Sequence, residues 1–121
     1  MTNMELDAKC AEAMEWKRDS SRQYFDANGR WAASDFGFGR WSPSTKPDHA
    51  ALLRERLAEC GHDYAVECNP SMALVEVTVD GHCTTVSYGR DGLCPNVVAA
   101  ECRATAEAFV AAMASKEGSD R

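Results

Sequence analysis

Residues 75–86 read VEVTVDGHCTTV, and this stretch decides the fold. Valine stands at every second position from 75 to 79, which is the period of a strand that buries one face. The dipeptide Asp80-Gly81 predicts a two-residue hairpin, because a type I′ turn needs positive φ at both central positions. With that turn, Val77 lies opposite Thr84. We therefore expect an antiparallel hairpin with one apolar face.

The alternation extends upstream into a third strand. Tyr64, Val66 and Cys68 occupy alternate positions, and Asn69-Pro70-Ser71 then turns the chain. Residues 63–88 are therefore predicted to form a three-stranded antiparallel meander.

A first helix is predicted over residues 2–16. Thr2 can cap its start, and Glu5 three residues later completes a capping box. The face expected in the core carries Leu6, Cys10, Ala13 and Met14, and the face expected in solvent carries Asp7, Lys9, Glu12 and Glu15. Trp16 follows the pattern and is expected to fold back onto the core.

A second helix is predicted between the turn at 42–48 and Gly61. Thr45 is the expected cap, Pro47 suits the first turn, and Gly61 is a good stop. Its buried face carries Ala50, Leu53 and Leu57. His49 and His62 are expected at ordinary solvent-exposed positions.

A third helix opens at Pro95. Its apolar stripe is formed by Val98, Cys102, Thr105, Phe109 and Met113, a spacing suited to lying on a sheet. The many alanines between them raise helix propensity and permit close approach by a neighbour. Residues 115–121 are predicted to be a disordered tail.

Residues 17–46 follow neither a helical nor a strand period. Aromatic residues and glycines alternate there after a polar start. Because a structureless loop of this length is improbable inside a compact domain, part of it must be ordered. Trp31 to Phe38 can supply a short fourth edge strand.

These elements predict an α+β protein with the order α-α-β-β-β-α. Residues 1–114 are expected to form a single domain, in which three helices cover the meander as a helix/sheet/helix sandwich.

Composition excludes several classes of function. The 121 residues carry 13 Lys and Arg against 19 Asp and Glu, a net charge of −6, which argues against a DNA or RNA clamp. The sequence contains no apolar run that could span a membrane and no secretory signal at residues 1–16. We therefore expect a cytoplasmic protein without a membrane partner.

Six cysteines, at positions 10, 60, 68, 83, 94 and 102, are spaced too widely for a zinc knuckle. In a reducing cytosol they are expected to be free thiols that act as small apolar residues. A weak alternative is a metal or thiol module built on His82, Cys83 and Cys94. No metal and no cofactor is predicted.

Three segments together resemble the phage ABA sandwich domain family of small phage and prophage proteins. LDAKCAEAMEW at residues 6–16 is similar to that family's opening LDxxVAxxVMGW, although Glu15 stands where the family has glycine. WSPST at 41–45, with the helix that follows, resembles its YSTD turn and second helix, and PNVVAAECRATA at 95–106 resembles its closing helix. The resemblance implies a helix/sheet/helix sandwich, a phage origin and a bacterial host cytoplasm. It carries no catalytic residues.

No catalytic motif stands out. The sequence has no Gly-x-Ser-x-Gly elbow, phosphate-binding loop or dinucleotide fingerprint. His82 and Cys83 are adjacent on a predicted strand, so their side chains point to opposite faces. A dyad of Cys94 with His82 stays open as an alternative. We predict that the protein is not an enzyme and has no catalytic residues.

Residues 30–41, RWAASDFGFGRW, have the composition of a binding hot spot. The candidate binding residues are Arg30, Trp31, Phe36, Phe38, Arg40 and Trp41, with Arg90 as a second, separate contact. The structural alternative is that Trp31 and Trp41 fill the core beneath a loop.

The leading hypothesis is a non-enzymatic, phage-encoded protein that binds a host protein, such as a defence component, through this segment and an acidic surface. The alternative is a sponge for a small nucleotide signal, in which Arg30, Arg40 or Arg90 meets phosphate and an aromatic ring stacks on the base. A homodimer is compatible with both, since the alanine-rich helix and free sheet edges favour self-association.

Overall fold

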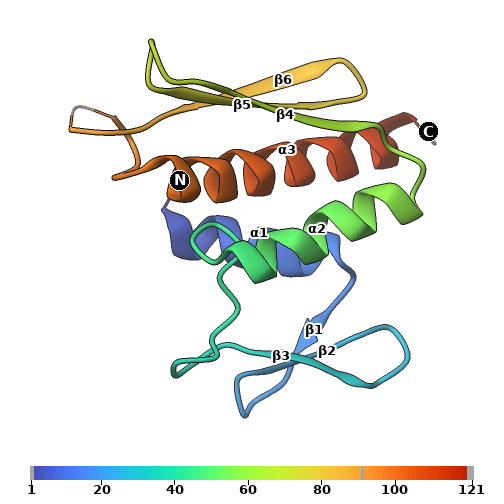
Figure 1. Ribbon diagram of the computed structural model, residues 1–121. Coiled ribbons are helices and arrows are strands. Elements are labelled where there is room, and N and C mark those ends of the chain that lie inside the picture. The colour runs from blue at the N-terminus through green and yellow to red at the C-terminus, as the bar shows by residue number, and fades with distance from the viewer. Residues whose placement is uncertain (1, 91, 120–121) are drawn as a thin grey trace.

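The computed structural model describes residues 2–90 and 92–119, with side chains through residue 114. The chain is an α+β protein with three helices and two separate three-stranded sheets among these residues. In chain order the elements are α1 (Asn3–Ala13), β1 (Lys17–Arg18), β2 (Gln23–Phe25), β3 (Trp31–Ser34), α2 (Pro47–Glu59), β4 (Tyr64–Asn69), β5 (Leu74–Val79), β6 (His82–Ser87) and α3 (Val97–Ser119). Figure 1 shows them stacked in layers, with one sheet at each end and the helices between.

The predicted meander is confirmed. β5 pairs with β6 so that Val77 lies opposite Thr84, and β4 pairs with β5 along its whole length. Asp80 and Gly81 both have positive φ, 51° and 86°, as the type I′ turn requires. The alternating valines of β5 are buried, at 1% exposure for Val75 and 0% for Val77.

The sandwich layout was wrong. α3 lies between the β4–β6 sheet and the pair α1 and α2, so the helices all lie on one side of this sheet (Figure 1). The helix is therefore buried on more than one face, and its small side chains allow both neighbours to approach closely. The buried alanines are Ala100, Ala104, Ala106 and Ala108.

The predicted stripe of α3 is correct in its middle and wrong at its start. Cys102, Thr105 and Phe109 are buried, whereas Val98 at the first turn is 51% exposed. α3 packs on β5 and β6, and this leaves the inner face of β4 partly open. Val66, which shares that face with buried Val77, is 42% exposed for this reason.

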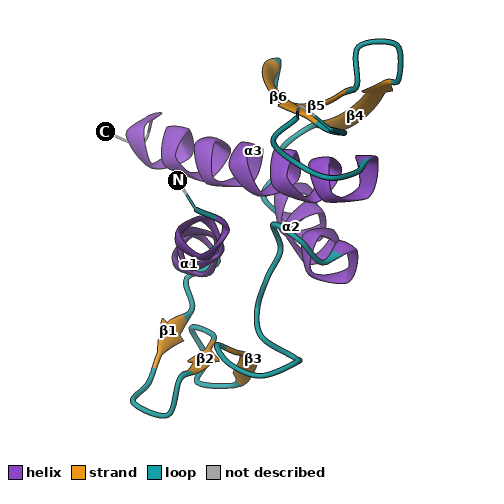
Figure 2. Ribbon diagram, turned by 90° about the vertical axis from the view of Figure 1, so that its left-hand side faces the viewer, coloured by secondary structure: helices purple, strands orange, loops and turns teal. Residues whose placement is uncertain are grey.

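The irregular segment forms a sheet of its own. β1, β2 and β3 are antiparallel neighbours, so the element order is α-β-β-β-α-β-β-β-α and not the predicted α-α-β-β-β-α. Trp31–Ser34 is a strand, but it pairs with β2 and not with the meander. Figure 2 shows this small sheet standing beneath α1, on the far side of the helices from β4–β6.

The helix ends follow the sequence in part. Thr2 caps α1 by accepting a hydrogen bond from the Glu5 amide at 3.1 Å, and Gly61 has the left-handed φ of 82° expected of a stop. Thr45 does not cap α2, because the cap position is Lys46 and the Thr45 hydroxyl bonds Ser42 instead. A disordered tail was predicted at residues 115–121. α3 instead continues to Ser119, and residues 120 and 121 lie outside the described residues.

In the part of the chain that the structure describes, the helices are too short or too polar to cross a membrane.

Candidate functional site

The loop that enters α2 is tied to α1 by a buried carboxylate. Asp7, 2% exposed, accepts hydrogen bonds from the Ser44 amide at 3.0 Å and from the Ser42 hydroxyl at 3.2 Å. The backbone carbonyl of Asp7 accepts a third, from the Trp41 indole N–H at 3.0 Å. The expectation that Asp7 faces solvent was therefore wrong. The helical period gave no signal for this burial, because adjacent residues of a helix do not share a face.

Trp41 belongs to the core and not to a binding surface. Its ring is 2% exposed, meets the Trp16 ring edge-on at 4.6 Å and stacks on His49 at 5.2 Å. His49 is only 17% exposed in its side chain, and its Nδ1 accepts the Ser42 N–H at 2.9 Å, so its predicted exposure was also wrong. Burial lowers the pKa of this imidazole, and nearby Lys46 acts in the same direction.

The other three rings of the segment point outward. Trp31 is 61% exposed, Phe36 47% and Phe38 104%, and we call these three residues the aromatic surface. Trp31 is an exposed ring held in one place, because its indole N–H donates to the Gln23 side-chain oxygen at 2.6 Å. Phe36 lies 5.9 Å from the Arg22 guanidinium. Phe38 is held through its backbone, whose carbonyl accepts from the Lys46 ammonium at 2.6 Å.

The predicted arginines do not gather at one place. Arg30 is exposed at the start of β3, whereas the Arg40 guanidinium lies 3.7 Å from Asp35 and 4.0 Å from Asp7. Arg90 is in the loop between β6 and α3, and Figure 1 shows β6 across the helices from the β1–β3 sheet. Arg18 and Arg22, which the sequence did not single out, both contact Asp35, and Arg22 also lies beside Phe36.

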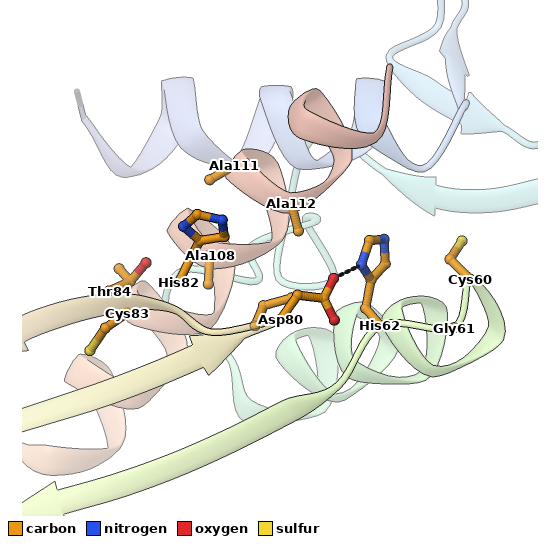
Figure 3. Close-up of a pocket in the computed structure, with 11 residues that line it drawn as sticks. Cys60, Gly61, His62, Asp80, His82, Cys83, Thr84, Ala108, Ala111 and Ala112 are labelled. Carbon is orange, nitrogen blue, oxygen red and sulfur yellow. Dashed lines mark hydrogen bonds and ion pairs between the residues drawn. The ribbon is translucent and has the colours of Figure 1, made fainter. Parts of the chain in front are cut away.

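A cleft of about 550 Å³ lies between the β5–β6 turn, the end of α2 and the second half of α3. Figure 3 shows the His62 ring beside the Asp80 carboxylate at the rim of this cleft, and the two side chains are hydrogen-bonded. The Asp63 amide donates to the same carboxylate at 2.8 Å. The hydrogen bond from His62 holds the pKa of Asp80 below its usual value. His62 is thus a partner of the hairpin turn, not the free surface histidine expected.

The candidate metal and thiol residues stay apart. Figure 3 shows the His82 and Cys83 side chains diverging from their strand, as the alternation predicts. Cys94 bonds to the end of β6 at Ser87, four residues from Cys83 and hence roughly 13 Å away along the strand. Among the described residues, no three His, Cys, Asp or Glu side chains lie close enough to hold a metal.

The thiols divide by burial. In the described part of the chain all six cysteines are free, with Cys68 and Cys83 exposed and Cys10, Cys94 and Cys102 buried. Burial raises the pKa of the Cys102 thiol to about 11 and raises that of Cys10 further, with the Asp7 charge adding to the effect.

A second cleft of about 340 Å³ separates the end of α1 from α2 and the β2–β3 turn. Trp16 and Leu52 contribute apolar surface to it, and Glu15, Glu55 and Glu59 contribute carboxylates. Arg30, Arg40 and Arg90 line neither this cleft nor the 550 Å³ cleft.

No family model, no curated protein and no solved structure matches the chain.

Proposed function

We propose that this chain is a non-catalytic binding protein that docks on a partner protein through the aromatic surface. The observation that supports this proposal is that large rings are held in exposed positions: the Trp31 indole by Gln23, and Phe36 beside Arg22. Tryptophan and arginine dominate the energetics of protein interfaces. Rings that are already ordered lose less conformational entropy on binding, which favours affinity.

The hydrogen bond from Trp31 also indicates how a partner is met. Because the indole N–H is already satisfied by Gln23, the ring offers its apolar faces rather than a polar donor. The partner should therefore present apolar groups to Trp31, and Phe38 between its two glycines should extend the same contact.

The partner we propose is a defence protein of a bacterial host, met in the host cytoplasm during phage infection. This narrower part of the proposal rests on the resemblance of residues 6–16, 41–45 and 95–106 to the phage family. A nucleotide sponge is less favoured, because Arg30, Arg40 and Arg90, its expected phosphate contacts, line neither the 550 Å³ cleft nor the 340 Å³ cleft.

The test is co-purification of the tagged protein with proteins from a bacterial extract, comparing two triple variants. W31A/F36A/F38A removes the aromatic surface. The matched control M72A/L93A/V98A removes three exposed apolar side chains elsewhere, at 66%, 65% and 51% exposure. We expect a partner that is captured by the wild type and the control and lost by the aromatic variant, with unchanged melting temperatures. A partner retained by the folded aromatic variant would refute the proposal.

A further inference from the structure

Three guanidinium groups converge on one carboxylate beside the aromatic surface. The Asp35 carboxylate lies 2.6 Å from Arg18, 3.9 Å from Arg22 and 3.7 Å from Arg40. Arg18 belongs to β1, Arg22 to the turn before β2, and Arg40 to the loop before α2. Only the fold of the small sheet therefore brings them together.

The cluster has more positive charge than its carboxylates neutralise, because three guanidinium groups face Asp35 and, 4.0 Å from Arg40, Asp7. Asp35 is only 14% exposed in its side chain, whereas Arg18 is 54% and Arg22 57% exposed. Each guanidinium has five N–H donors. In the described residues, one N–H of Arg18 bonds the Asp35 carboxylate and one of Arg22 bonds the Asp35 backbone carbonyl. More than half of each of these two side chains faces solvent.

The charge of the surrounding segment differs from that of the rest of the molecule. Residues 17–40 contain five basic and three acidic side chains, against eight basic and sixteen acidic in the rest of the chain. This basic segment on an acidic protein attracts an anionic partner.

We infer that Arg18, Arg22 and Arg40 form an anion site that receives a side-chain carboxylate from an acidic segment of the docked protein. The inference rests on the proposed function and names the chemistry of its partner. Arginine forks match carboxylates in a planar, paired geometry, and here they already hold one, that of Asp35. The Phe36 ring beside Arg22 places an apolar contact next to the charged one. The partner segment should therefore combine Asp or Glu with apolar side chains.

The site can be tested by titrating the full-length, ¹⁵N-labelled protein with hexaglutamate, inorganic phosphate or sodium chloride at matched ionic strength. The Nε–Hε signals of the arginines report binding. We expect those of Arg18 and Arg22 to shift saturably with hexaglutamate, while that of Arg90, across the molecule, stays in place. Arg22→Gln should weaken binding about fivefold, Arg22→Lys by less, and the control Arg90→Gln not at all.

Several outcomes would overturn the inference. Equal shifts with sodium chloride would mean unspecific screening, saturation by phosphate alone would mean a phosphate site, and unchanged affinity in folded Arg22→Gln would exclude that side chain. The variant W31A/F38A separates this inference from the proposed function. If it binds hexaglutamate normally and still captures the partner protein, docking through the rings is refuted while the anion site stands.

Discussion

The carboxylate of Asp7 accepts the backbone N–H of Ser44 at a distance of 3.0 Å, across 37 residues of sequence. This bond joins the first helix to the loop that leads into α2, and it positions Trp41 so that its ring fills the core while the preceding residues stay outside. Residues 6–16 and 41–45 thus meet in one buried contact. The buried core thus begins at Trp41, and the exposed aromatic surface lies in the residues before it.

Replacing Asp7 should therefore lower the free energy of unfolding more than replacing an exposed acidic residue of α1. Asp7→Ala leaves the Ser44 amide and the Ser42 hydroxyl without their acceptor, and we expect a loss of about 3 kcal/mol in the free energy of unfolding. Glu12→Ala, on the exposed side of the same helix, should change it by less than about 0.5 kcal/mol. Urea denaturation measures both, and equal effects would contradict a structural role for Asp7.

Stability should fall in mild acid through His49. Burial lowers the pKa of this imidazole from its ordinary 6.5, so the unfolded chain binds a proton that the folded chain resists. Its contribution is complete above pH 6.5 and is lost as the pH falls below 6.5 through the folded-state pKa, at up to about 1.4 kcal/mol per pH unit. Protonation also removes the acceptor of the Ser42 amide.

Urea unfolding between pH 7.5 and 5 tests this pH dependence. His49→Asn should flatten the curve, whereas His82→Asn, at an exposed position, should leave it as in the wild type. A wild-type slope in the His49→Asn protein would exclude His49 as the cause.

Glycine should be tolerated at position 15. Glu15 has φ of 65°, and the Trp16 amide donates back to the Ala11 carbonyl, the bond of a glycine-type helix end. Glu15→Gly relieves left-handed strain, so we expect stability to be unchanged or higher by up to about 1 kcal/mol. Lys9→Gly, inside α1 with exposed side chain, should lower stability by about 1 kcal/mol. Thermal unfolding measures both variants. A melting temperature lowered equally by Glu15→Gly and Lys9→Gly would contradict the relief of strain at position 15.

The two exposed thiols should react first with a thiol reagent. Cys68 and Cys83 are exposed, whereas Cys10, Cys94 and Cys102 are buried with raised pKa values and hence little thiolate. We expect a fast phase in native protein that disappears in C68S/C83S, and full reaction only in denaturant. A fast phase that survives the double substitution would contradict the placement of β4 and β6.

Much of the fold was predictable because it is encoded locally. The Asp80-Gly81 turn determines the register of β5 and β6, and the Thr2 cap and the Gly61 stop mark helix ends with neighbouring residues alone. For the candidate site, the sequence selected residues 30–41 by their composition, and three of the four rings there are exposed. It missed Arg18 and Arg22, because ion pairs across a sheet leave no periodic signal.

By itself, then, the sequence determined the helices, the meander and the aromatic segment, since turn chemistry and hydrophobic period act over a few residues. Only the tertiary structure decided that α3 is a middle layer, that residues 17–34 form a second sheet, and that Trp41 faces inward while Trp31 faces outward. The two tryptophans have the same intrinsic hydrophobicity. Their burial differs because Trp41 contacts Asp7, Trp16 and His49, which come from distant parts of the chain. Trp31 instead donates a hydrogen bond to Gln23 at the edge of a small sheet.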